Sequence, residues 1–223
     1  MSTPQPGRAH HGWFLGFPAA AVLAGGCRGP EYRPEIAVTQ ARPIIDVKAE
    51  FHGLYPAQAL VSGARTYGLD APDAKRQSPT ELTAQLDQAM LEELSAAGVF
   101  SRVTGFDPKP DLVLAGRIDA FHEEYRPRAW TYVPIIDRKL LSKLLNLKTH
   151  TSTGEARLTL FVMTPEGGVI GRYEGRSAFH ESFNPTDEVP PGARLNRALS
   201  DAVRDIQGQI VRDAQLRQLA SRS

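Results

Sequence analysis

The most regular hydrophobic pattern in the chain lies between residues 78 and 97. Apolar residues recur there every three or four positions, which places them on one face of an α-helix: Leu82, Leu86, Ala89, Met90, Leu94 and Ala97. The start is marked by Ser78, Pro79 and Glu81, a capping serine, a proline suited to the first helical position and the glutamate of a capping box. Gly98 follows as the residue type that commonly ends a helix. We therefore expect an amphipathic helix here.

Several shorter stretches have the alternation or the β-branched composition of strands. They are residues 44–51, 99–104, 112–125, 155–163 and 169–183. Pro165–Gly168 has the composition of a hairpin turn, which predicts that the last two strands are antiparallel neighbours. A second helical pattern starts at Leu195 and ends near Gln218.

The order of these elements predicts the fold class. Strand, helix, two strands, an insert, two strands and a helix suggest an α/β (α+β) fold. We expect a two-layer sandwich of a mixed, mostly antiparallel sheet of about five strands, with two long amphipathic helices. The first strand–helix–strand passage should be a right-handed crossover, which gives one parallel pair. Residues 43–218 then form a single domain.

The N-terminus has the pattern of an export signal. A weakly basic start with Arg8 is followed by an apolar run from Trp13 to Leu23 and by small residues that end at Gly26. The run is shorter than the roughly 20 residues that span a bilayer. We therefore expect residues 1–26 to be a signal peptide that is cleaved after Gly26.

Cys27 follows at once and is the single cysteine of the chain, so it has no partner for an intramolecular disulfide. A thiol at this place suits attachment of a lipid, with residues 27–42 as a lipidated tether that contains Pro30 and Pro34. An ordinary signal peptide, or an uncleaved anchor, with an incidental cysteine is the alternative.

An amphipathic insert, residues 126–150, separates two strands that would otherwise form a simple meander. Its candidate contact residues combine an apolar set with two lysines: Trp130, Tyr132, Ile136, Leu140, Leu144, Lys139 and Lys143. Ile136, Leu140 and Leu144 share a helical face. Three interpretations stay open, namely a helix that packs on the domain's own sheet, a docking helix for a partner protein and a basic helix on an anionic membrane.

Composition and motifs argue against several classes of function. The formal net charge of +1 gives no reason to expect binding to nucleic acid. The pairs His122–Glu123 and His180–Glu181 lack metal-ligand spacing, and no nucleophile elbow, phosphate loop or dinucleotide fingerprint is present. We expect no metal, no cofactor and no catalytic residue. An enzyme with a site built from loops 52–77 and 184–192 is the least favoured alternative.

The combined pattern resembles a group of bacterial envelope lipoproteins. The relevant stretches are the lipobox-like residues 23–27, the capped helix, PDLVLAGRIDAF at 110–121 and the hairpin GEARLTLFVMTPEGGVIGRYEG at 154–175. They are similar to ABC-type transport auxiliary lipoproteins, YajG-like lipoproteins and the curli-secretion channel lipoprotein group, which are built on the α/β fold of the TolB N-terminal domain. The resemblance implies a nonenzymatic accessory of transport, export or assembly.

These observations together predict a location and partners. We expect a protein of the bacterial cell envelope that is held by its N-terminal lipid at the outer membrane and faces the periplasm. Its partners would be the membrane and an envelope protein complex. The alternative function is a periplasmic carrier that binds a lipid or small ligand in a groove lined by the leucines of the insert.

Overall fold

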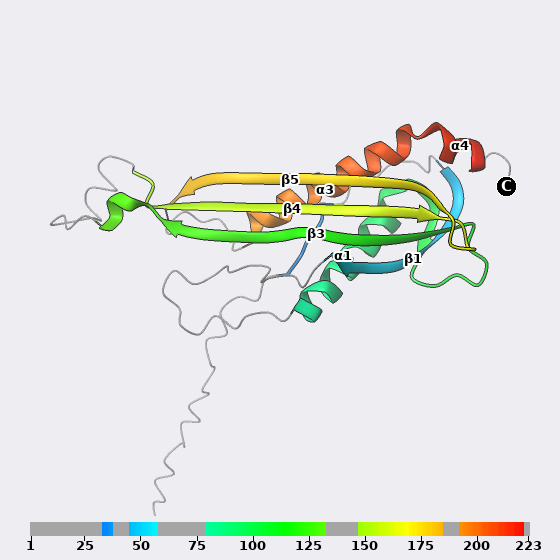
Figure 1. Cartoon of the computed structure of the whole chain (residues 1–223), viewed down its shortest axis with the longest axis horizontal. Coiled ribbons are helices and arrows are strands. Elements are labelled where there is room, and N and C mark those ends of the chain that lie inside the picture. Colours follow the sequence, from blue (N-terminus) through cyan, green and yellow to red (C-terminus); the bar gives the residue numbers. More distant parts are fainter. Residues whose placement is uncertain (1–32, 38–44, 58–78, 133–146, 185–191, 221–223) are drawn as a thin grey trace, which may run out of the picture.

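The structure, a computed structural model, describes residues 33–37, 45–57, 79–132, 147–184 and 192–220 (Figure 1). The elements are β1 (Ile45–Pro56), α1 (Pro79–Ala97), β2 (Phe100–Thr104), β3 (Leu112–Pro127), the 3-10 helix η1 (Ala129–Tyr132), β4 (His150–Met163), β5 (Val169–Phe183), α3 (Ala193–Arg212) and α4 (Ala214–Ala220). The strands form one sheet in the order β2–β1–β3–β4–β5, and α1 and α3 cover one face of it. The predicted two-layer α/β sandwich is confirmed.

Strand pairing is mixed, with one more parallel pair than expected. β1 is parallel to β2 along its first half and parallel to β3 along its second half, so it lies between them. The β3–β4 and β4–β5 pairs are antiparallel and much longer, and the sheet is therefore mostly antiparallel by length of ladder. The prediction of a single parallel pair was wrong because nothing local in the sequence shows that β3 pairs with the far side of β1.

β1 continues beyond residue 51, where the sequence pattern suggested the start of a long loop. Gly53 has a positive φ of 90°, and the register with β3 shifts between Phe51 and Leu54. The side chain of Asp87 on α1 accepts a hydrogen bond from the Leu54 amide, and burial raises the pKa of that carboxyl group. The glycine therefore forms a bulge inside the strand instead of ending it. Most of the expected loop, residues 58–77 of 52–77, lies outside the described residues.

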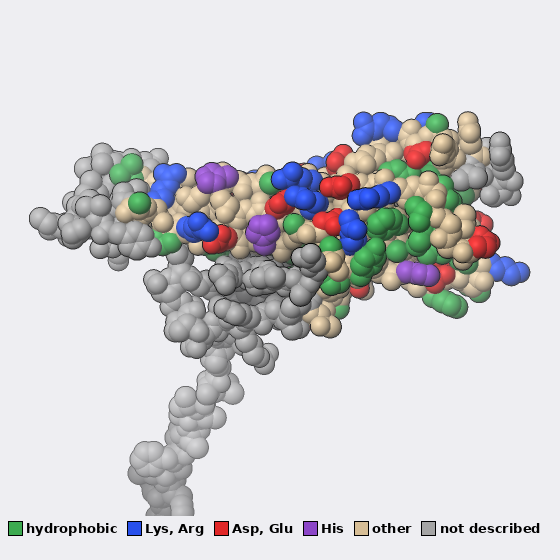
Figure 2. Space-filling view, in the orientation of Figure 1, with side chains coloured by type: hydrophobic (Ala, Val, Ile, Leu, Met, Phe, Trp, Pro, Cys, Tyr) green, Lys and Arg blue, Asp and Glu red, His purple; other side chains and the backbone are tan. Residues whose placement is uncertain are grey.

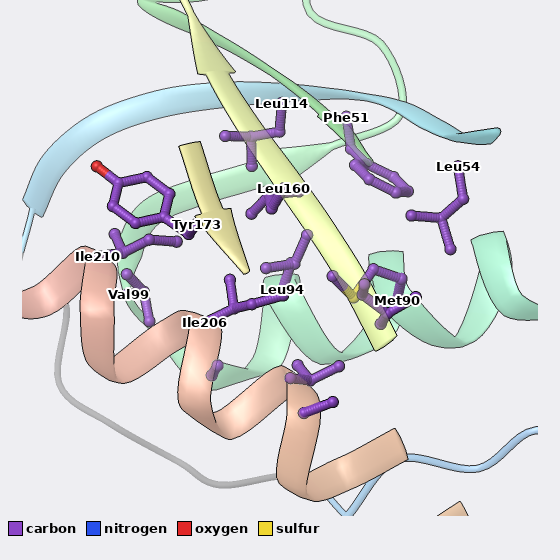
Figure 3. Packing of buried hydrophobic residues seen from close by; sticks show 14 of the residues in the cluster. Phe51, Leu54, Met90, Leu94, Val99, Leu114, Leu160, Tyr173, Ile206 and Ile210 are labelled. Carbon is purple, nitrogen blue, oxygen red and sulfur yellow. The ribbon is translucent and has the colours of Figure 1, made fainter. Parts of the chain in front are cut away.

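The first helix has the bounds that its pattern predicted, and all six apolar residues of its predicted face are buried. Gly98 ends it with a φ of 69°. Ser78, the expected cap, lies outside the described residues. Figure 3 shows Met90 and Leu94 of α1 near Leu160 of the sheet and Ile206 of α3. The two helices and the sheet thus share one hydrophobic core.

The second helical pattern is divided into two helices at Asp213, which corrects the expectation of one helix to Gln218. Asp213 has extended backbone angles, and its carboxylate accepts hydrogen bonds from the amides of Gln215 and Leu216, at 2.8 and 3.3 Å. The hydroxyl of Tyr173 donates to the same carboxylate at 2.7 Å and holds its pKa below the usual range. The apolar spacing continues through the break, which is why the pattern alone did not show it.

α3 approaches the sheet very closely at Gly175 of β5. A Cβ atom on this residue would lie 1.9 Å from the carbonyl oxygen of Ala202. Side chains around this contact are fully buried, among them Ala202, Ile206 and Leu160. The backbone of α3 therefore occupies the space that a side chain at position 175 would need.

We expect Gly175→Ala to lower the free energy of unfolding by about 1–3 kcal/mol, because the new methyl group forces the helix away from the sheet. Gly208→Ala is the matched control in α3, since its Cβ would meet only the end of the Arg212 side chain at 3.5 Å. That variant should gain up to about 1 kcal/mol from helix propensity. Urea unfolding followed by circular dichroism measures both. Equal stability of the two variants would contradict the close contact.

Candidate interaction surface

The structure describes the surroundings of the predicted site residues better than the residues themselves. Cys27 and Gly26 lie outside the described residues. The insert residues Ile136, Lys139, Leu140, Lys143 and Leu144 also lie outside them. Trp130 and Tyr132 belong to η1, and only the backbone of these two residues is described. The structure does show where the insert leaves the sheet.

The insert is attached at the far end of the β3–β4 ladder. Pro127 pairs with His150 at this end, and the amide of Arg128 donates to the carbonyl oxygen of Thr149 at 2.9 Å. The opposite end of the ladder pairs Val113 with Met163, about 45 Å away at 3.3 Å per residue. Figure 1 shows η1 at this tip, beyond the ends of the long strands.

The part of the sheet that carries the insert is narrower than the rest. β1 last pairs with β3 at Ile118, and the β3–β4 register shifts just after it. Beyond that point the sheet continues as three strands, residues 119–127, 150–157 and 176–183, for about 30 Å (Figure 1). We call these residues the distal ribbon.

A cluster of aromatic and charged side chains supports the distal ribbon near its tip. The ring of Phe183 meets the ring of Tyr125 edge-on at 5.3 Å and lies 5.6 Å from the His150 ring. The guanidinium group of Arg194, from the first turn of α3, lies over Phe183 at 4.6 Å and donates to Glu181 at 2.7 Å. Burial raises the pKa of Tyr125. These five residues, the distal cluster, join the three strands of the ribbon to the helix layer.

Two carboxylates are buried. Glu123 is 1% exposed and accepts a hydrogen bond from Ser152 at 2.7 Å, while Glu93 accepts one from Gln207 at 3.0 Å. The second oxygen of each has no hydrogen-bond partner in the described part of the chain. Glu124 is instead paired with Arg126 on the opposite face, as strand alternation predicts for adjacent residues. Glu123 and Glu124 therefore do not form an acid–base pair.

The face of the sheet opposite the helices, which we call the outer face, carries a ladder of charges. Arg117 pairs with Asp119 at 2.7 Å, and Thr159 donates to the same carboxylate. Glu155 accepts from both Arg157 and Arg176. Burial alone would raise the pKa of Glu155, but the two arginines lower it. Figure 2 shows these basic and acidic groups side by side across the middle of the face.

An apolar region adjoins this ladder on the outer face, as Figure 2 shows. Phe161 lies between the guanidinium groups of Arg117 and Arg172, at 5.9 and 6.0 Å from its ring centre. Val113 and Met163 follow on the same side of the strands. The combination of half-buried apolar side chains and flanking arginines is typical of surfaces that bind other proteins.

The outer edge of β5 is also accessible. The side chain of Gln209 reaches around from α3 and donates to the carbonyl oxygen of Glu174 at 2.7 Å, so this carbonyl points away from β4. Alternate residues of a strand point their amide and carbonyl groups to the same side. Like Glu174, residues 176, 178, 180 and 182 therefore point these backbone groups towards the outer edge. Such groups can pair with an added strand.

The histidines do not gather into a metal site in the part of the chain that the structure describes. Among the described residues, no group of three or more His, Cys, Asp or Glu side chains lies close enough together to hold a metal ion. His52 pairs with Glu50 at 3.2 Å, and His122 and His180 are exposed. No helix among the described residues is long and apolar enough to cross a membrane.

Comparisons with known proteins give little beyond this description. No protein-family model and no curated protein matches the chain. Among solved structures, protein XCC0632 from Xanthomonas campestris, described under the family model DUF330, is 13% identical, with a TM-score of 0.46 over 86% of this chain and 98% of that one. An uncharacterized protein is 11% identical, with a TM-score of 0.32 over 84% and 95%. Neither similarity indicates what this chain does.

We expect Arg194→Ala to destabilise the domain by about 1–3 kcal/mol, because it leaves Phe183 uncovered and removes a buried charge partner. Arg197→Ala is the matched control, since Arg197 contacts the same Glu181 at 3.4 Å but its side chain is 68% exposed, against 7% for Arg194. Its loss should stay below about 0.5 kcal/mol. Urea unfolding measures the difference, and equal losses would contradict a supporting role for the distal cluster.

Proposed function

We propose that this chain is a lipid-anchored lipoprotein of the bacterial envelope, and that it acts as a nonenzymatic accessory of a transport, export or assembly complex. The N-terminal pattern that ends at Cys27 supports the anchor. The position of the insert at the end of the distal ribbon supports the accessory role, and it is the observation on which this proposal rests.

A projecting ribbon suits contact with another protein. It carries the insert about 45 Å from the hairpin at the opposite end of the ladder. The distal cluster ties the ribbon to α3, so that the insert is presented on a supported element. The apolar residues of the insert, with Lys139 and Lys143 among them, suit a partner surface that has an apolar groove and acidic residues at its rim.

The alternative, a carrier for a lipid or small ligand, has less support. Such a protein would need space for its ligand, and the obvious place lies between the sheet and the helices. Among the described residues, this region is filled by side chains with no exposure or almost none, including Leu114, Leu158, Leu160 and Ile206. We therefore favour a function that depends on surface contacts.

The anchor is tested by Cys27→Ala in cells fed with radiolabelled palmitate. We expect the wild-type protein to carry the label and to sediment with the membrane fraction, and the variant to lose both properties, because a thiol is required for lipid attachment. Separation of the inner and outer membranes then tests the expected outer-membrane location. Label retained by the variant would contradict the anchor.

The partner contact is tested by replacing residues 129–148 with a two-residue Asn-Gly turn. The Arg128–Thr149 hydrogen bond is kept, so the ladder can close as an ordinary hairpin. We expect cooperative unfolding to persist and the protein that copurifies reproducibly with wild type from detergent-solubilised envelope to be lost. Arg197→Ala is the control, with copurification retained.

Two results would count against this contact. Retention of the same copurifying protein by the replacement variant would show that the insert is not the contact site. Loss of cooperative unfolding would show that the insert belongs to the core of the domain.

A further inference from the structure

A short N-terminal segment, residues 33–37, is bound to α3. The side chain of Asn196 donates to the carbonyl oxygen of Arg33 at 3.2 Å and accepts from the amide of Glu35 at 3.1 Å. The amide of Ala37 donates to the hydroxyl of Ser200 at 3.0 Å. One turn of α3 therefore binds the backbone of this segment at three points.

Apolar contacts strengthen this attachment. Pro34 is buried, and Ile36 packs against the hydrophobic core. Ser200, which accepts the last of the three hydrogen bonds, is itself buried. The residues expected to form a tether thus include a segment that is part of the folded domain.

The covalent chain limits how far this segment can lie from the lipid. Six residue-to-residue steps separate Arg33 from Cys27. Fully extended, they span at most about 20 Å. If the lipid of Cys27 is inserted in the bilayer, the bound end of the segment and the nearby turn of α3 lie within about 20 Å of the membrane surface.

This distance restricts the orientation of the domain. The segment is bound to α3, and α3 lies on the face of the sheet opposite the outer face (Figure 1). A helix with its side chains is about 10–12 Å thick, and the sheet beneath it adds roughly 10 Å. Because Ile36 packs against the core between these layers, the chain from Cys27 to Arg33 would have to pass around the sheet to place the outer face against the bilayer, whereas the helix layer lies on the segment's own side of the sheet.

We infer that residues 33–37 act as a clamp that turns the helix layer of the anchored protein towards the membrane and the outer face away from it. This inference rests on the proposed lipid at Cys27. It assigns the surface around α3 to the lipid headgroups and leaves the charged ladder and the apolar region around Phe161 available to a partner protein. The orientation rests on the side of the sheet where the segment is bound and does not require attraction between charges.

The orientation is tested with a fluorescent donor on one introduced cysteine, because acylation leaves Cys27 unreactive. Asp205→Cys places the donor on an exposed position of α3, and Ala178→Cys places it on an exposed position of the outer face. The full lipidated chain is reconstituted in phosphatidylcholine vesicles whose headgroups carry an acceptor of short transfer distance. We expect transfer from position 205 to be at least twofold that from position 178. Equal or reversed transfer would overturn the inference.

The clamp itself is tested by the double variant Asn196→Ala with Ser200→Ala, which removes the three hydrogen bonds. The ratio of the two transfer efficiencies should then fall towards one. Asp201→Ala is the matched control on the same helix, since Asp201 pairs with Arg204 instead of with the segment, and it should keep the wild-type ratio. A double variant that stays folded by circular dichroism and keeps the wild-type ratio would overturn the role of the clamp.

Failure of the orientation and failure of the anchor give different results. The same labelled chains with Cys27→Ala should show no transfer at either position if the lipid holds the protein on the vesicle. Transfer that persists without the cysteine would overturn the lipid anchor and, with it, this inference. Lipidated protein that binds vesicles but transfers equally from both positions would overturn the orientation alone.

Discussion

The contact between α3 and β5 is the one on which most other features of this structure depend. The backbone at Ala202 takes the place of a side chain on residue 175, and this fixes the height and direction of the helix over the sheet. From that position the first turn of α3 brings Arg194 to the distal ribbon, and a later turn brings Gln209 to the edge of β5. The same helix binds residues 33–37. One close approach thus positions the bound segment 33–37, the support of the ribbon and the Gln209 contact at the edge of β5.

The two ends of the molecule are built differently. The proximal end has five strands and two helices around a shared hydrophobic core. The distal ribbon has three strands. Phe121 and Ala156 at its base still belong to the core, whereas nearer the tip the contacts include the rings around Phe183, the Arg194–Glu181 pair and the buried Ser152–Glu123 hydrogen bond. A broad apolar core is suited to stability, whereas a narrow supported projection is suited to reaching another molecule. This division is consistent with a domain whose function lies in what it holds at its tip.

Local chemistry in the sequence predicted α1 and the β4–β5 hairpin well, because a cap, a stop glycine and a turn act on neighbouring residues. It failed where distant residues decide the structure. The second parallel pair depends on β3 lying beside β1, and Asp213 at the break accepts a hydrogen bond from the hydroxyl of Tyr173, forty residues earlier. Arg194 gave no signal of its role, since an arginine near a helix start is usually solvated. The candidate site residues at 133–146 and Cys27 remain predictions, because they lie outside the described residues.

The binding of the N-terminal segment also sets an order of events during biogenesis. The bond between Glu35 and Asn196 joins residues 161 positions apart, and the bond between Ala37 and Ser200 joins residues 163 apart. Contacts of such long separation require closure of a loop that contains most of the chain. If the chain is exported from its N-terminus as proposed, residues 33–37 must therefore wait for α3, one of the last elements to emerge. In an anchored protein the lipid would be attached to a chain that is still unfolded. The domain would take up its orientation at the membrane only when folding is complete.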